Sequence, residues 1–172
     1  MSDIIDVIRN RQSTRAYTGK LVDNNLLEKI LEAGRLSPSA RNTQPWTIYC
    51  TSRKEVIDKL GAGFAAIGRN LFVKDCGAFI AIVEEPLPEE LKMHRRYAEF
   101  DIGMCIMQIC LEAESLGVSS CILGSYDEDS VKTVLGIPKD KSVAMVIALG
   151  YASDPTVRPK ARKSFDEAIK II

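Results

Sequence analysis

The sequence has 172 residues, of which 46% are hydrophobic and 27% are charged. These fractions are close to the averages of globular domains, so they argue against a disordered chain and against a coiled coil. Lys and Arg number 23, and Asp and Glu also number 23, which gives a net charge of zero. This balance argues against a protein that binds nucleic acid or an anionic membrane through its overall charge.

No linker, repeat or low-complexity tract interrupts the sequence, so we predict a single domain over residues 1–172. The first residues carry acidic side chains where a secretory peptide would be basic. The longest nearly uncharged apolar stretch, residues 102–111, is too short to span a bilayer. We therefore expect a cytoplasmic protein.

The five cysteines contain no C-x-x-C pair and His94 is the single histidine, so we expect no metal site. His94 lies among charged residues and is expected to be a solvated helix side chain. Cys76, beside Asp75 and Gly77, is expected to be partly exposed. The other four cysteines lie within apolar runs, where a free thiol behaves as a small hydrophobe: Cys50, Cys105, Cys110 and Cys121.

Hydrophobic periodicity predicts a chain of alternating helices and strands. A cap at Asp23 or Asn24 begins the second helix, and Gly61 and Gly63 are expected to break the third. The order of elements favours a sheet wrapped by helices, of the α/β or the α+β class. The predicted helices are residues 4–11, 24–36, 55–60, 65–72, 89–116, 129–135 and 165–171, and the predicted strands are residues 46–51, 78–83, 118–123 and 143–149.

The longest predicted helix, residues 89–116, is apolar on almost every side in its second half. A helix of this kind is buried, so we expect it either in the core or at a dimer interface. Gly117 is placed to end it.

The first polar cluster, residues 11–15, follows the first predicted helix. In an extended chain Arg11, Ser13 and Arg15 share one side and offer two guanidinium groups and a hydroxyl to one anion. Arginine forks suit the geometry of phosphate. The alternative is a solvated run of charges at a helix end.

Two further clusters lie at residues 37–46 and 158–163. The first places small and amide side chains between two prolines, which makes a rigid loop able to present hydrogen-bond donors to a flat polar ring. The second is basic and extended. The alternatives are a plain connection and a solvated tail. Because no nucleotide-binding glycine motif, zinc motif or serine-nucleophile motif occurs, an organic cofactor is the candidate for carrying the chemistry.

In combination, these segments resemble the FMN-dependent nitroreductase family. Residues 11–17 (RQSTRAY) resemble its R-x-S-x-R/K signature followed by an aromatic, and residues 38–46 (PSARNTQPW) resemble its P-S-x-x-N-x-Q-P-W segment. The remaining matches are the D-x-G helix entry in residues 97–103, the helix exit in residues 116–118, the last strand in residues 147–151 and the basic tail in residues 159–162. The resemblance implies an α+β fold with a mixed central sheet flanked by helices, and a long buried helix at the interface of an obligate homodimer.

The resemblance also implies which residues hold the phosphate of FMN. Arg11 and Ser13 would bind it, and Gln12 would contact its ribityl or phosphate end. Lys160 and Arg162, from the tail of residues 151–172, would complete the phosphate site.

Around the flavin ring, the resemblance places Arg15 near N1 and the C2 carbonyl, where a cation stabilises negative charge. Backbone N–H groups at Leu123 and Gly124 would point at N5 and O4, and Gln44 and Asn70 are possible further contacts. Four residues would reach the ring from the partner subunit: Pro38, Ser39, Ala40 and Asn42.

The implied activity is a ping-pong reduction of nitroaromatic, quinone or related acceptors by NADH or NADPH. No side chain is expected to act as acid or base. Three alternatives stay open: another flavin chemistry on the same fold, a flavin-binding module that senses without turnover, and a small anion-binding domain without flavin.

Overall fold

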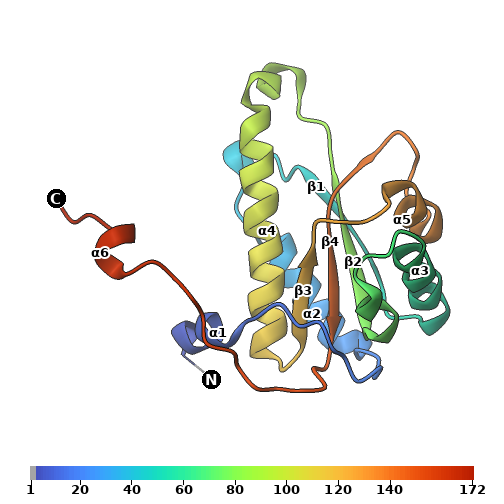
Figure 1. Ribbon diagram of the computed structural model, residues 1–172. Coiled ribbons are helices and arrows are strands. Elements are labelled where there is room, and N and C mark those ends of the chain that lie inside the picture. Colours follow the sequence, from blue (N-terminus) through green and yellow to red (C-terminus); the bar gives the residue numbers. More distant parts are fainter. Residues whose placement is uncertain (1–2) are drawn as a thin grey trace.

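Four strands form one sheet in the computed structural model, which describes residues 3–172 and, of residues 93–96, the backbone alone. The strands are β1 (Trp46–Thr51), β2 (Ala78–Glu84), β3 (Ser119–Leu123) and β4 (Ser142–Gly150), in the order β1-β2-β4-β3 (Figure 1). All four predicted strands are confirmed. The predicted mixed pairing is wrong, because each of the three strand pairs is antiparallel.

Helices cover both faces of the sheet (Figure 1). The long helix α4 packs with α2 on one face, and α3 packs with α5 on the other. The α+β class expected from the resemblance is therefore confirmed. The helices are α1 (Ile4–Asn10), α2 (Asn24–Arg35), α3 (Lys54–Ala66), α4 (Arg95–Ser115), α5 (Glu128–Leu135) and α6 (Phe165–Ala168), with 3-10 turns η1 (Ala40–Asn42), η2 (Leu71–Asp75) and η3 (Glu89–His94).

Local sequence explains where several helices begin and end. The Asp23 carboxylate caps α2 by accepting a hydrogen bond from the Asn25 backbone N–H at 2.8 Å. Gly117, just after α4, adopts a left-handed φ of 73°, as its predicted role as a helix stop requires.

The predicted break in the third helix is wrong, because α3 continues through Gly61 and Gly63. Gly61 lies against η2: a Cβ at this position would sit 3.0 Å from the Lys74 Cα. Close packing, not a helix stop, accounts for this glycine. The helix predicted over residues 65–72 is replaced by the end of α3 and by η2, and α6 is shorter than predicted.

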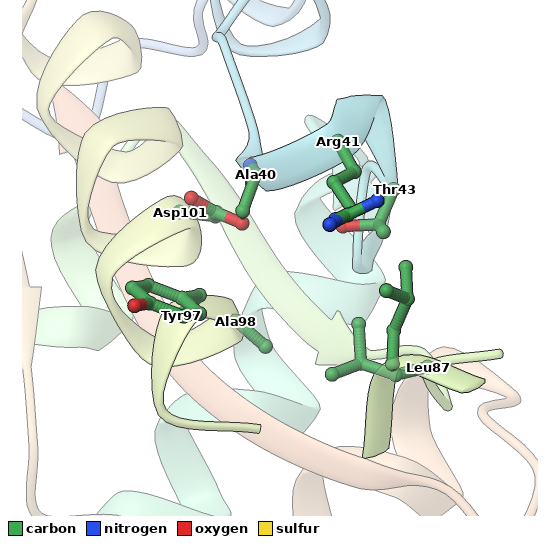
Figure 2. A pocket seen from close by; sticks show the side chains of 8 residues that line it. Ala40, Arg41, Thr43, Leu87, Tyr97, Ala98 and Asp101 are labelled. Atoms are coloured by element: carbon green, nitrogen blue, oxygen red, sulfur yellow. Dashed lines mark hydrogen bonds between the residues drawn. The ribbon is translucent and has the colours of Figure 1, made fainter. Parts of the chain in front are cut away.

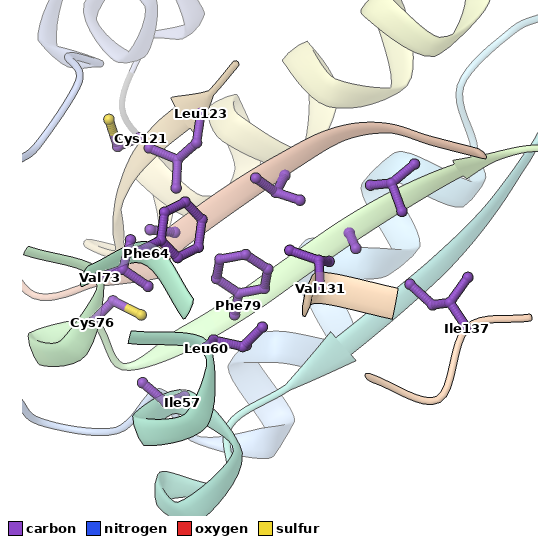
Figure 3. Close-up of a cluster of buried hydrophobic side chains, with 14 of the residues drawn as sticks. Ile57, Leu60, Phe64, Val73, Cys76, Phe79, Cys121, Leu123, Val131 and Ile137 are labelled. Atoms are coloured by element: carbon purple, nitrogen blue, oxygen red, sulfur yellow. The ribbon is translucent and has the colours of Figure 1, made fainter. Parts of the chain in front are cut away.

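The central strands β2 and β4 carry the core. Residues 78–83 of β2 are buried on both faces, which explains their uninterrupted apolar run. On the α3–α5 face, Phe64 meets Phe79 edge to face with ring centroids 5.9 Å apart (Figure 3). On the other face, Ile109 of α4 packs against Gly34 of α2, where a Cβ would lie 2.6 Å from the Ile109 side chain.

Within one chain, α4 is buried along one side only. Tyr97, Phe100, Met104 and Met107 keep 39–53% of their surface exposed and follow each other at helical spacing along the outer side. The prediction that this helix is buried on every side is therefore wrong for a single chain. The side chain of His94, predicted to be solvated, lies outside the described residues.

The cysteine environments differ from the sequence-based expectation at two positions. Cys76 is 1% exposed, whereas Cys50, on the edge strand β1, is exposed. Burial raises the pKa of the Cys76 thiol to about 12 and that of Cys105 to about 12, so both stay protonated at neutral pH. Over residues 3–172, as far as they are described, no acidic, histidine or cysteine cluster could hold a metal ion, and none of the helices has the length and apolar character needed to cross a membrane.

These environments predict how the five cysteines react with a thiol reagent. In the folded protein at pH 8, Cys50 should react first and alone, because Cys76, Cys105, Cys110 and Cys121 are buried. Titration with Ellman's reagent should release one equivalent from the native protein and five after unfolding in guanidinium. Two or more equivalents released at the same rate from the native protein would contradict this packing.

Candidate active site

The segment that follows α1 is fixed along the edge of the sheet. The Thr14 backbone N–H donates to the Ser120 carbonyl at 3.0 Å, and Ser13 forms an isolated parallel bridge with Ser120. Because the bridge is parallel, the segment runs in the same direction as β3. Arg15 therefore lies further toward the Leu123–Gly124 end of β3 than Ser13 does.

Tyr17 anchors this segment to strand β4. Its side chain is 7% exposed, and its hydroxyl donates to the Ala148 carbonyl at 3.1 Å. Burial raises the pKa of Tyr17 far above its usual range, so the phenol stays neutral and keeps this hydrogen bond. The ring fits because residue 150 is a glycine: a Cβ there would lie 2.9 Å from the Tyr17 Cδ1.

The C-terminal tail crosses over the same segment and is tied to it by Arg158. The Arg158 guanidinium donates from Nη2 to the Ser13 carbonyl at 2.6 Å and from Nε to the Gln12 Oε1 at 3.0 Å. Gln12 in turn donates from Nε2 to the Thr156 carbonyl at 2.9 Å. The side chain of Gln12 thus holds the tail in this structure. This role of Arg158 could not be predicted from the sequence, where the residue is one charge in the basic run of residues 158–163.

Between the segment and the tail lies a pocket of about 420 Å³, which we call the cationic pocket. Lys160 lines this pocket, and its Nζ is buried with no hydrogen-bond partner among the described residues. A buried ammonium without a partner is costly, and an anion in the pocket would satisfy it. The lining residues are Arg11, Gln12, Ser13, Arg15, Arg158, Pro159, Lys160, Ala161 and Arg162.

The composition of the cationic pocket fits a phosphate ester. Its five cationic side chains outnumber the charge of about −2 that a phosphate carries at neutral pH. Glu114 of α4 lies nearby: partial burial raises the pKa of its carboxyl, and the charges of Arg11 and Lys160 oppose that rise. Cys121 offers no nucleophile here, because burial raises the pKa of its thiol despite the charge of Arg15.

The predicted loop, residues 38–46, is held at the other half of α4. The Ala40 backbone N–H donates to the Asp101 Oδ2 at 3.0 Å, and the Ser39 hydroxyl accepts from the Gln44 backbone N–H at 2.9 Å. Asp101, only 3% exposed, is a positioning residue that sequence reasoning did not identify as such, although it stands in the quoted D-x-G match.

This loop stores backbone strain in three residues that are not glycine. Arg41, Asn42 and Gln44 have φ values of 51°, 56° and 46°, in the left-handed region. Each such residue costs about 1–3 kcal/mol, and strain of this kind concentrates at functional sites.

Beside the loop lies a second cavity, of about 250 Å³, which we call the Arg41 pocket (Figure 2). Asp101 and Tyr97 of α4 line one side of it, and Arg41 and Thr43 lie on the other, with Leu87 below them in the view. Its lining residues are Ala40, Arg41, Thr43, Leu87, Leu91, Tyr97, Ala98 and Asp101.

A single chain does not bring the two sets of predicted site residues together. The loop of Pro38, Ser39, Ala40 and Asn42 is held beside Asp101, whereas the cationic pocket lies near Glu114. Asp101 and Glu114 are thirteen positions apart on α4, which corresponds to about 20 Å along its axis.

The third predicted element of the site follows β3. Leu123 is buried and ends the strand, and Gly124 is exposed beyond it. Asn70, which was predicted as a possible cofactor contact, donates from Nδ2 to the Ser125 carbonyl at 2.8 Å. Asn70 thereby fixes the backbone just after Gly124.

Comparison with known proteins relates this arrangement to one family. The model of the Nitroreductase family matches residues 8–70 and 64–151. A protein of Archaeoglobus fulgidus, provisionally named NADH dehydrogenase/NAD(P)H nitroreductase, is 30% identical over 176 residues, covering 98% of this chain and 92% of its own. The oxygen-insensitive NADPH nitroreductase of Helicobacter acinonychis is 27% identical, covering 78% of this chain and 81% of its own.

Solved structures share the fold. A provisionally named nitroreductase of Exiguobacterium sibiricum, solved in complex with FMN, has a TM-score of 0.82 at 21% identity and covers 100% of this chain and 98% of its own. An FMN-dependent nitroreductase of Clostridium difficile has a TM-score of 0.76 at 23% identity, with coverages of 97% and 98%.

The contacts of Arg158 predict that its removal releases the tail. In the cofactor-free protein, Arg158→Ala should raise the hydrogen-exchange rate of the amides in residues 156–162 by about fivefold, because two side-chain hydrogen bonds are lost. Arg162→Ala is the matched control, since among the described residues its guanidinium bonds only the neighbouring Ala161 carbonyl. Equal exchange in the two variants would show that Arg158 does not hold the tail.

Proposed function

The chain belongs to the nitroreductase family, and from this premise we propose that it is an FMN-dependent oxidoreductase that takes electrons from NADH or NADPH. The proposed acceptors are nitroaromatic compounds, quinones and related molecules. The names of the relatives support the donor, since two of them are named for NAD(P)H or NADPH nitroreductase activity. The FMN named with two structures of the same fold supports the cofactor.

The observation that carries the proposal is Lys160: its Nζ is buried without a hydrogen-bond partner in the described part of the chain, and the residue lines a pocket together with four arginines. We assign this pocket to the phosphate of FMN. Arg11 and Arg162 would add charge-assisted hydrogen bonds, and Ser13 would add its hydroxyl. Gln12 would act by holding the tail over the phosphate, with its amide bonded to Thr156 and Arg158.

When bound, FMN supplies two-electron transfer between the donor and the acceptor. The protein's part is to bind and orient it. Residues 13–15 run parallel to β3. This direction supports a bound orientation in which the phosphate of FMN would lie near Ser13 and its ring would lie toward Arg15 and Gly124. There, Arg15 would stabilise negative charge at N1 and the C2 carbonyl, and backbone N–H groups at Leu123 and Gly124 would face N5 and O4.

We further propose that the whole chain, residues 1–172, is one FMN-binding domain that works as a homodimer. The separation of about 20 Å between the two parts of the site supports a second copy, whose Pro38, Ser39, Ala40 and Asn42 would face the ring. The exposed apolar stripe of α4 supports the same arrangement, because apolar surface of this kind is typical of obligate interfaces.

Two measurements test this function. The protein loaded with FMN should show visible flavin absorption that bleaches when NADH or NADPH is added without oxygen, and it should recover on addition of a quinone. Bands that persist would favour a sensing module, and a failure to bind FMN would refute the assignment.

The phosphate site is tested by Lys160→Met, which should weaken FMN binding about tenfold or more, because a charge-assisted hydrogen bond to the phosphate is lost. Lys163→Met is the matched control: this exposed lysine of the tail lies outside the cationic pocket. Fluorescence titration of FMN gives both dissociation constants. Equal constants for the two variants would remove Lys160 from the phosphate site.

A further inference from the structure

The Arg41 pocket is divided into an apolar and a polar side. Leu87, Leu91, Ala98 and the ring of Tyr97 offer a surface for a flat apolar group. The volume of about 250 Å³ is below the roughly 300–1,000 Å³ of pockets that hold drug-sized ligands, which favours a portion of one ring.

The polar side centres on Arg41. Of the lining residues that the structure describes, Arg41 is the one cation, and no hydrogen bond or ion pair to another described residue uses its guanidinium. The Thr43 Oγ1 beside it is buried and also lacks a partner within the described part of the chain. The pocket thus presents the planar fork of donors of Arg41, and the hydroxyl of the neighbouring Thr43 is buried beside it.

The one carboxylate in the pocket does not neutralise Arg41. Asp101 is 3% exposed, and its Oδ2 accepts the Ala40 backbone N–H, so this oxygen is committed to holding the loop. The same bond fixes the backbone just before Arg41, whose left-handed φ of 51° is unfavourable for a residue with a side chain. The strained backbone and its anchor together hold the arginine at the mouth of the pocket.

From these observations we propose that Arg41 is a specificity-determining residue: the Arg41 pocket takes a one-ring substrate, and the guanidinium binds an anionic oxygen group that the substrate carries. A carboxylate on an acceptor and a phosphate of the nicotinamide donor share this chemistry, because both match the guanidinium fork. The inference rests on the proposed function in that the pocket borders the loop assigned to the flavin ring.

Arg41→Gln tests the proposal through paired substrates. The acceptors are 4-nitrobenzoate and the uncharged 4-nitrobenzamide, and the donors are NADH and N-benzyl-1,4-dihydronicotinamide, which has no phosphate. In the variant, kcat/KM for the anionic member of one pair should fall about tenfold or more relative to its uncharged partner. The affected pair identifies the source of the anion. An unchanged ratio in both pairs would overturn the proposal.

Two control variants separate charge from geometry. Arg41→Lys should lose part of the preference, because an ammonium keeps the charge without the planar fork. Lys59→Gln removes one positive charge from the exposed side of α3, on the opposite face of the sheet, and should leave both ratios unchanged.

A binding measurement separates this proposal from the proposed function. Calorimetry with 4-nitrobenzoate and, separately, with NAD⁺, which carries the phosphates of the donor, should show that at least one of them binds Arg41→Gln about tenfold more weakly than the wild type, with 4-nitrobenzamide affected less. If the wild type binds 4-nitrobenzoate through Arg41 but never reduces FMN, the proposed function fails while the pocket assignment stands. If FMN is reduced and reoxidised but Arg41→Gln binds 4-nitrobenzoate and NAD⁺ like the wild type, only the assignment of Arg41 fails.

Discussion

Like charges from the two ends of the chain converge on one pocket, and their mutual repulsion is the constraint around which this site is built. One pocket is lined by the segment that carries Arg11 and Arg15 and by the tail that carries Lys160 and Arg162. All four side chains are positively charged, so their electrostatic repulsion opposes this arrangement. Neutral partners hold them: the Ser13 carbonyl and the Gln12 amide receive Arg158, and the Thr14 amide pairs with the edge of β3. These hydrogen bonds hold the segment and the tail together around the pocket.

The second half of the site depends on strain instead of charge. Three residues of the loop after α2, Arg41, Asn42 and Gln44, have a left-handed backbone conformation. The buried Asp101 carboxylate of α4 holds this loop by accepting a hydrogen bond from the Ala40 backbone N–H. Helix α4 therefore serves both halves, with Asp101 toward one end and Glu114 toward the other. A rigid helix keeps these positions about 20 Å apart, and this separation supports the proposal that the two halves meet between chains.

Much of this fold could be predicted from the sequence, and the exceptions have physical causes. The strands were found because each is a short apolar run bounded by polar residues or glycine. The helix stop predicted at Gly61 was wrong because close packing, here against η2, favours glycine as much as a helix stop does. Cys50, expected to be buried, is exposed, and Cys76, expected to be partly exposed, is buried. Strand position and tertiary contacts decide this burial, and neither can be derived from the neighbouring residues. Arg11 and Ser13 were predicted as an anion site from their spacing, and the family resemblance added Lys160 and the phosphate of FMN. The roles of Arg158 and Asp101, in contrast, required contacts between residues far apart in sequence.

A complementation experiment tests the central claim that each site is shared between two copies. One variant, Arg11→Ala with Lys160→Ala, lacks the cationic pocket, and another, Ser39→Ala with Asn42→Ala, lacks the loop contacts. Each should bind FMN poorly alone. After unfolding and refolding together in equal amounts, about a quarter of the sites should regain wild-type affinity, because half the dimers are mixed and each contains one intact site. No recovery in verified mixed dimers would contradict the shared site.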